Sequence, residues 1–235
     1  NSIGLQNPGL DGFVNESWSF LESLDTAIIV NIAAPTVDAH ARMAERLAPL
    51  ERIAALEVNI SSPNMKDGGM LFGCNPVAAA EVIGAVRKTA ARPVIAKLTP
   101  NVTDITEIAR AVEDAGADAI SLINTLVGMA VDVPSRHPVL DNLTGGLSGP
   151  AIKPVALAML WKVRQMVQLP LMGIGGIMDF NDALEFMIAG ASAVQVGTAT
   201  FVKPDAATVL VSGLEAYCAE QNFSDISKIV GSLST

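Results

Sequence analysis

Four asparagines are the side chains best suited to binding a polar ligand. Three lie at or just beyond the ends of apolar runs, and the fourth opens a glycine-containing loop. They are Asn1, Asn59, Asn64 and Asn124. Amide groups supply hydrogen-bond donors and acceptors without charge. Several amides in one pocket favour a planar ligand with alternating carbonyl and N–H groups, such as a pyrimidine, although each asparagine alone could simply cap its loop.

Two glycine-containing turns are candidates for binding a phosphate group. Gly175 and Gly176 follow one apolar run, and Gly197 and Thr198 follow the next run along the chain. Glycine lets a ligand approach the main chain, whose N–H groups can bind an anion. Either pair alone could be only a tight turn, but their presence after two consecutive runs favours a phosphate site.

A lysine and a serine complete the set of candidates. Lys97 lies within an apolar run, where a charged side chain is costly to bury unless it is paired. It is therefore predicted either to face a ligand or to reach solvent at the end of the strand. Ser62 precedes Pro63 in a glycine-rich loop that could close over a substrate, which makes it a candidate for proton transfer. Serine before proline also occurs for structural reasons alone.

Six short apolar runs alternate with six amphipathic segments. The runs span 27–32, 55–60, 94–98, 119–124, 171–174 and 193–196, and the amphipathic segments span 37–47, 76–91, 104–115, 153–167, 179–189 and 204–220. Near-continuous apolar strands are typical of parallel sheets covered by helices. Asp104 followed by Glu107 fits the start of a helix, and the glycines of AGADAI and AGASAV fit helix ends.

This alternation predicts an α/β fold, a (β/α)8 TIM barrel of which six of the eight β/α units are visible. Residues 1–235 would form a single barrel domain that is incomplete at its N-terminus. Barrel active sites lie at the C-terminal ends of the strands, and phosphate often binds after the last two strands. An open, doubly wound sheet is the alternative fold.

The composition restricts the classes of function. A formal net charge of −9 disfavours nucleic acid and anionic membrane surfaces as partners. No apolar run has the length of a membrane span, and no signal peptide opens the sequence. Two distant cysteines, Cys74 and Cys218, predict neither a disulfide framework nor a zinc site. We therefore expect a cytoplasmic protein without a metal site.

Seven phrases resemble the class 1 dihydroorotate dehydrogenases, especially the B type. They read NSIGLQNPG, LEVNISSPNMKDGGMLFG, AKLTPNVTDI, INTLVGMAVD, GGLSGPAIKP, MGIGGIMDFNDALEF and AGASAVQVGTA. The resemblance implies FMN-dependent oxidation of dihydroorotate to orotate in pyrimidine (UMP) synthesis, with the C5 proton leaving to a base and the C6 hydride passing to flavin N5. It also implies a partner subunit carrying FAD and a 2Fe-2S cluster, NAD as final acceptor, and a homodimer of catalytic subunits within a heterotetramer.

The same resemblance implies roles for individual residues. Asn1, Asn59, Asn64, Asn124 and Thr125 would bind orotate. Lys97 would contact the flavin. The FMN phosphate would be held by Gly149, Gly175, Gly176, Gly197 and Thr198.

Two departures from the family pattern matter. The family base is usually a cysteine, but the matching position here is Ser62, whose hydroxyl is far less acidic than a thiol and would need a proton relay. Serine is the base in the class 2 enzymes, and Cys74 in the same loop does not match the position of the base. The family pattern also begins earlier, with two barrel strands, a flavin-facing loop and a substrate lysine.

Three alternatives remain open. A dihydropyrimidine dehydrogenase-like FMN barrel, acting on another reduced pyrimidine, would also use the asparagines. A truncated barrel could keep a flavin or phosphate site without catalysing a reaction. A lyase or isomerase with a phosphorylated substrate would need no flavin.

Overall fold

The computed structural model describes residues 1–4, 6–61 and 72–234, and its centre is a parallel six-stranded sheet with the order β1-β2-β3-β4-β9-β10. All six predicted strands are confirmed. They are β1 (Ile28–Ile32), β2 (Ile53–Asn59), β3 (Val94–Leu98), β4 (Ala119–Leu122), β9 (Leu171–Ile174) and β10 (Ala193–Gln195). Strand β4 ends two residues before the predicted end, although Ile123 N and Asn124 N still donate to Ile174 O and Leu98 O on the neighbouring strands.

The six predicted helices are also present. They are α3 (Val37–Leu47), α4 (Pro76–Thr89), α5 (Ile105–Asp114), α6 (Lys153–Arg164), α7 (Phe180–Ala189) and α9 (Ala206–Glu220). The side chain of Asp104 accepts a hydrogen bond from Thr106 N at 2.9 Å, as expected for the residue that caps α5. Helix α6 ends at Arg164, three residues before the end of the predicted segment.

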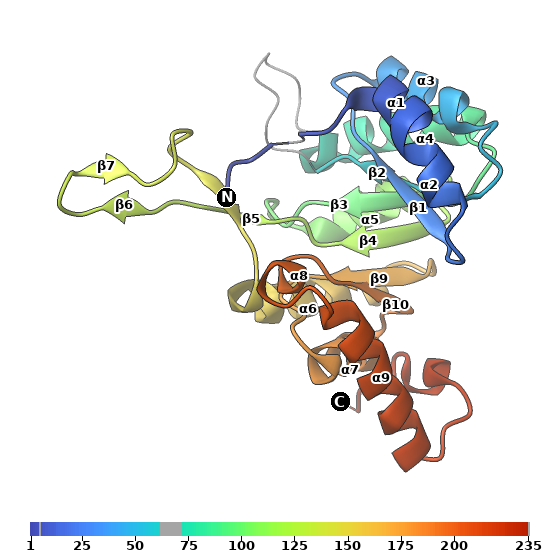
Figure 1. Cartoon of the computed structure of the whole chain (residues 1–235), viewed down its shortest axis with the longest axis vertical. Coiled ribbons are helices and arrows are strands. Elements are labelled where there is room, and N and C mark those ends of the chain that lie inside the picture. The colour runs from blue at the N-terminus through green and yellow to red at the C-terminus, as the bar shows by residue number, and fades with distance from the viewer. Residues whose placement is uncertain (5, 62–71, 235) are drawn as a thin grey trace.

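The helices and the strand order argue for a barrel rather than a doubly wound sheet. Each of the six helices contacts the next one along the chain, as a single outer layer requires. The strands follow one another in chain order, without the reversal that defines a doubly wound sheet. Figure 1 shows the resulting curled sheet with helices on its outside. The described residues thus supply six consecutive β/α units of barrel type.

Alternation along the strands separates an apolar outer face from a polar inner face. Leu56 and Val58 belong to the buried core between sheet and helices. Glu57 and Asn59 alternate with these two residues along β2, and they therefore point to the other side of the sheet. The register pairs Asn59 with Lys97 and Lys97 with Ser121. Polar side chains from three neighbouring strands therefore lie side by side inside the curl.

Several shorter elements were not predicted. They are α1 (Gly9–Gly12), a π-helical turn (Phe13–Ser17), α2 (Trp18–Glu22), α8 (Ala199–Val202) and 3-10 turns at Phe72–Cys74, Pro150–Ile152 and Ile226–Ile229. Within the part of the chain that the structure describes, no helix combines the length and the apolar character needed to cross a membrane.

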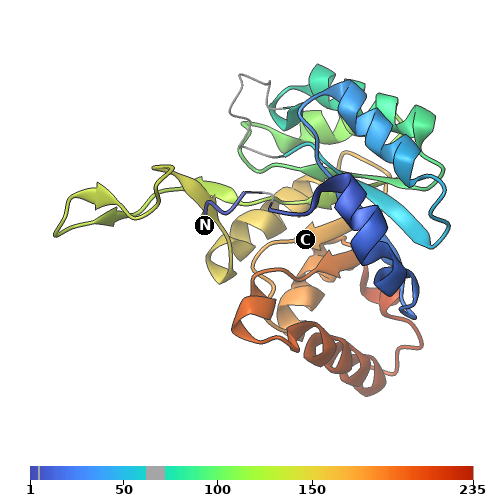
Figure 2. The same ribbon diagram turned by 45° about the horizontal axis from the view of Figure 1, so that its top comes forward.

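The largest unpredicted feature is an arm between β4 and α6, residues 126–147. Strand β5 (Leu126–Gly128) pairs with β8 (Gly145–Leu147), and β6 (Val131–Asp132) pairs with β7 (His137–Pro138), both antiparallel. The hairpin of β6 and β7 projects far from the body in both ribbon views (Figures 1 and 2). Several apolar side chains on it are exposed, and Val133 is the most exposed of them at 81%.

Candidate active site

Two adjoining cavities lie where the strands end. The amide cavity, about 360 Å³, is lined by Asn1, Asn31, Asn59, Lys97, Asn124 and Thr125. The glycine cavity, about 160 Å³, is lined by Gly149, Gly175, Gly176, Gly197 and Thr198. Lys97, Asn124 and Thr125 line both cavities. The described candidates for ligand binding thus gather around one continuous region.

Two of the residues predicted to take part in catalysis or ligand binding lie outside the described residues. They are Ser62, the candidate for proton transfer, and Asn64, a candidate for ligand binding. Ser61 is the last described residue before them, and it is buried at 4% exposure. Ser61 is bonded to Asn59 and Asn124, two residues that line the amide cavity.

Ser61 links the two asparagines on this wall. Asn59 Oδ1 accepts hydrogen bonds from Ser61 N at 3.1 Å and from Ser61 Oγ at 2.7 Å. Asn124 Nδ2 donates to Ser61 Oγ at 2.6 Å, while its Oδ1 accepts from Thr125 N at 2.7 Å. These bonds fix the orientation of both amides. Among the described residues, they leave the Asn59 NH2 group and the second N–H of Asn124 available to donate to a ligand carbonyl.

Asn1 reaches the cavity by pairing with the base of the arm. Gly146 N donates to Asn1 O at 2.7 Å, and the main-chain nitrogen of Asn1 donates to Gly146 O at 3.0 Å. A Cβ atom on Gly145 would lie only 2.4 Å from Asn1 O. This close approach explains the first of the paired glycines in GGLSGPAIKP, and Thr125 explains the second, because a Cβ atom on Gly146 would lie 2.5 Å from Thr125 Oγ1.

Lys97 stands at the junction of the cavities. Its side chain lies on the inner face of β3. The register pairs it with Asn59 on one side and with Ser121 on the other. Burial lowers the pKa of its ammonium group, and the negative charge of Glu57 opposes that lowering. The position of Lys97 favours contact with a ligand over simple extension to solvent.

An inner set of polar residues was not predicted from the sequence. Glu57 is buried at 5% exposure, and Ser121 is fully buried. Asn31 lines the amide cavity and Gln195 lines the glycine cavity. The signal that could have found Glu57 is its spacing from Asn59, because residues two apart in a strand share a face. Asn31 and Gln195 gave a weaker signal, as single polar residues in apolar strands.

The glycine cavity depends on a close approach of two loops. Gly176 has a φ of +74°, and a Cβ atom there would lie 2.7 Å from Gly149 O and 2.9 Å from Lys153 N. Across the cavity, Thr198 Oγ1 donates to Ser148 Oγ at 2.8 Å. A side chain at residue 176 would therefore separate the loops. The small cavity, its glycine walls and its hydroxyl groups fit a bound phosphate group.

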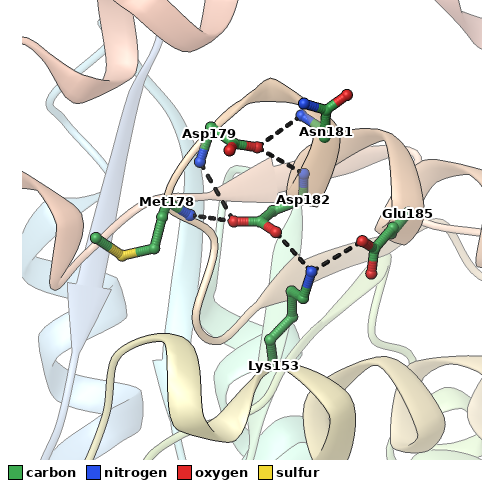
Figure 3. Close-up of polar contacts among 6 residues, drawn as sticks. All are labelled: Lys153, Met178, Asp179, Asn181, Asp182 and Glu185. Atoms are coloured by element: carbon green, nitrogen blue, oxygen red, sulfur yellow. Dashed lines mark hydrogen bonds and ion pairs between the residues drawn. The ribbon is translucent and has the colours of Figure 1, made fainter.

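Lys153 and two carboxylates form a network that holds the loop after β9 in place (Figure 3). Lys153 Nζ donates to Asp182 Oδ1 at 2.6 Å and to Glu185 Oε1 at 2.8 Å. The other Asp182 oxygen accepts from Met178 N at 2.8 Å. Hydrogen bonds to the two carboxylates hold the pKa of Lys153 above its ordinary value. Lys153 is thus held by Asp182 and Glu185. Among the described residues that line the glycine cavity, the cation is Lys97.

Cys74 is not among the described residues that line either cavity. Its thiol donates to Asn101 O at 3.6 Å, and burial raises its pKa. A raised pKa reduces the thiolate fraction, which is the opposite of what activates a cysteine. Cys74 is therefore a poor substitute for a catalytic base.

Comparisons with known proteins agree with the arrangement. A family model described as dihydroorotate dehydrogenase matches residues 1–217. The dihydroorotate dehydrogenase B (NAD(+)) catalytic subunit of Geotalea daltonii is 55% identical over 233 residues, 99% of this chain and 76% of the relative. The subunit of the same name from Trichlorobacter lovleyi is also 55% identical, over 99% of this chain and 77% of the relative.

A solved structure has the same fold. A crystal structure of DHODH from Eimeria tenella, in complex with ferulenol, superposes with a TM-score of 0.78 at 21% sequence identity. The match covers 99% of this chain and 70% of that one. At this identity the likeness concerns the fold alone.

Proposed function

The chain belongs to the dihydroorotate dehydrogenase family, in its B-type branch, and on that premise we propose that it oxidises dihydroorotate to orotate in pyrimidine (UMP) synthesis, with FMN as its cofactor. The observation that carries the proposal is the junction at Lys97, where an amide-lined cavity meets a glycine-lined one. One cavity suits a planar pyrimidine, and the other suits a phosphate group.

The residues of the glycine cavity would hold the cofactor. Gly149, Gly175, Gly176, Gly197 and Thr198 would surround the ribityl phosphate, and the ammonium of Lys97 would contact the flavin ring. When bound, FMN supplies the acceptor for the hydride that leaves C6 of dihydroorotate. Lys153 would stabilise the loop from behind through Asp182, without touching the phosphate itself.

The residues of the amide cavity would bind and orient the substrate. Asn59 and Asn124 would donate to carbonyl oxygens, since Ser61 and Thr125 hold their amide groups in fixed orientations. Asn1, Asn64 and Thr125 would complete the set. Ser62 would take the proton from C5 and release its own hydroxyl proton through a relay, because a neutral hydroxyl cannot keep both protons.

Electrons would leave through a second subunit. The relatives carry the words "NAD(+)" and "catalytic subunit" in their names, which supports NAD as acceptor and a separate partner chain. We propose that this partner carries FAD and a 2Fe-2S cluster.

The first test is the visible spectrum of the full-length protein. We expect it to purify yellow, and its flavin to bleach anaerobically with dihydroorotate but not with dihydrouracil. Bleaching by dihydrouracil instead would indicate a dihydropyrimidine dehydrogenase-like enzyme. A yellow protein that no reduced pyrimidine bleaches would indicate a non-catalytic barrel. A colourless protein that binds no added FMN would favour a lyase or isomerase.

The arm supports a homodimer of catalytic subunits. Its exposed apolar side chains are Val127, Met129, Val131, Val133, Val139, Leu143 and Leu147. Exposed apolar groups gathered on one projection are typical of a protein interface. Val133→Asp would place a charge in that interface and is expected to raise the dimer dissociation constant by about tenfold or more. Sedimentation velocity over a dilution series measures this change.

A matched control lies on the body of the protein. Val77, at the start of α4, is exposed at 68%. Val77→Asp adds the same charge without touching the arm, and we expect the dimer to persist. If Val133→Asp dimerises as tightly as the native chain, the arm is not the interface.

A further inference from the structure

Glu57 is a buried carboxylate to which the proposed mechanism assigns no role. Only 5% of the residue is exposed. Its Oε2 accepts a hydrogen bond from Asn31 Nδ2 at 2.6 Å. Its Oε1 accepts from Ser121 Oγ and from Gln195 Nε2, each at 2.7 Å. One side chain on β2 is thus bonded to residues from β1, β4 and β10.

These bonds place the carboxylate beside Lys97. The bond to Ser121 runs from β2 to β4, and the strand between them is β3, which carries Lys97. The side chains of Asn59 and Ser121 are the neighbours of Lys97 in the register. Glu57 therefore supplies a negative charge on the inner face close to the junction of the two cavities.

A buried charge needs an explanation beyond stability. Removing a carboxylate from water is costly, and a well-packed neutral group often stabilises a core equally well. The hydrogen bonds compensate part of that cost at Glu57, but they do not require a charge. Lys97 does benefit from one, since its own burial disfavours the ammonium form.

The carboxylate also fixes two amides. An ionised carboxylate only accepts hydrogen bonds, so Asn31 and Gln195 must turn their NH2 groups toward Glu57. This leaves Asn31 Oδ1 for the amide cavity and Gln195 Oε1 for the glycine cavity, because these residues line those walls. A neutral amide at residue 57 could donate as well as accept, and the two orientations would no longer be fixed.

We propose that Glu57 is a positioning residue that orients the amides of Asn31 and Gln195 and keeps Lys97 charged between the two cavities. The geometry of the hydrogen bonds is independent of the reaction. The consequence for the flavin and the substrate rests on the proposed function.

The test measures the charge of Lys97 without using activity. The full-length protein is stripped of flavin and trace-acetylated with acetic anhydride over a range of pH, and peptide mass spectrometry quantifies acetylation of Lys97 relative to the exposed Lys88. The neutral amine is the form that reacts. Glu57→Gln removes the charge, so we expect Lys97 to react several-fold faster at a given pH. Ser121→Ala keeps the carboxylate, and Lys97 should then react as in the native chain.

Binding of FMN tests the second part. We expect Glu57→Gln to weaken the affinity of the stripped protein for FMN about tenfold, the effect of losing one charge-assisted hydrogen bond. Glu57→Asp keeps the negative charge, but its shorter side chain moves the carboxylate away from Asn31, Ser121 and Gln195. We expect it to weaken FMN binding while leaving Lys97 acetylation close to native. This variant also tests the proposal if Glu57→Gln does not fold.

The outcomes separate this inference from the proposed function. Native-like acetylation in Glu57→Gln, or native FMN affinity in Glu57→Asp, would overturn the role of Glu57. Neither result depends on dihydroorotate. If the native protein binds FMN but dihydroorotate does not bleach it, the proposed reaction is wrong, and the acetylation result still stands on its own.

Discussion

Gly176→Ala is expected to leave the protein folded but nearly free of flavin. The residue has a φ of +74°, a conformation that an alanine adopts only with strain. Its Cβ atom would lie 2.7 Å from Gly149 O and 2.9 Å from both Lys153 N and Lys153 Cβ. Two of these are main-chain atoms, so the loops would have to separate. A loss of about 3 kcal/mol at the site would weaken FMN binding about a hundredfold.

The measurement is the ratio of flavin to protein absorbance after purification, followed by titration of the stripped protein with FMN. Gly84→Ala is the matched control. A Cβ atom on Gly84, within α4, would lie no closer than 4.0 Å to Ala115 O, so the same substitution meets no obstacle there. Circular dichroism of both variants checks the fold. A yellow Gly176→Ala protein with native affinity would exclude this loop from the phosphate site.

Sequence patterns predicted the strands and helices because those depend on local hydrophobic periodicity. Strand β3 and helix α3 have the predicted bounds, since β3 is a near-continuous apolar run and the buried residues of α3 recur at helical spacing. The arm was not predicted, because its strands are too short to show such periodicity. Its strands have two or three residues, and pairing within the arm, rather than burial in the core, holds them together.

The candidate site was predictable where a residue follows a strand. Asn124, Gly176 and Thr198 all lie after strands whose ends must meet at one edge of a parallel sheet. The contacts between strands were not predictable. Glu57 lies 138 residues from Gln195 along the chain, and their hydrogen bond depends on the curl and register of the whole sheet. Ser61 was missed because its neighbour Ser62 matched the position of the family base.

Ser62→Ala is expected to slow reduction of the flavin by dihydroorotate about 10²- to 10⁴-fold, the usual contribution of a positioned proton acceptor. FMN should remain bound, because the glycine cavity lies on other loops. Ser62 is outside the described residues, but Ser61 directly before it is bonded to Asn59 and Asn124. Stopped-flow absorbance under anaerobic conditions measures the reduction step apart from electron transfer to any partner.

Cys74→Ser is the control within the same region. Burial raises the pKa of this thiol, and it is not among the described residues that line either cavity, so reduction should proceed at the native rate. A native rate in Ser62→Ala, or a large loss in Cys74→Ser, would dismiss Ser62 as the base.

Ser62→Cys then distinguishes a base from a merely structural serine. A serine hydroxyl does not ionise in the accessible pH range, so the native rate depends on a relay that removes its proton. A thiol titrates within that range. If residue 62 accepts the C5 proton, the rate of flavin reduction in Ser62→Cys should rise with pH as the thiolate forms. A structural serine would give no such dependence, because replacing its oxygen by sulfur would change packing equally at every pH. A pH profile identical to that of the native chain would therefore place proton transfer on another group.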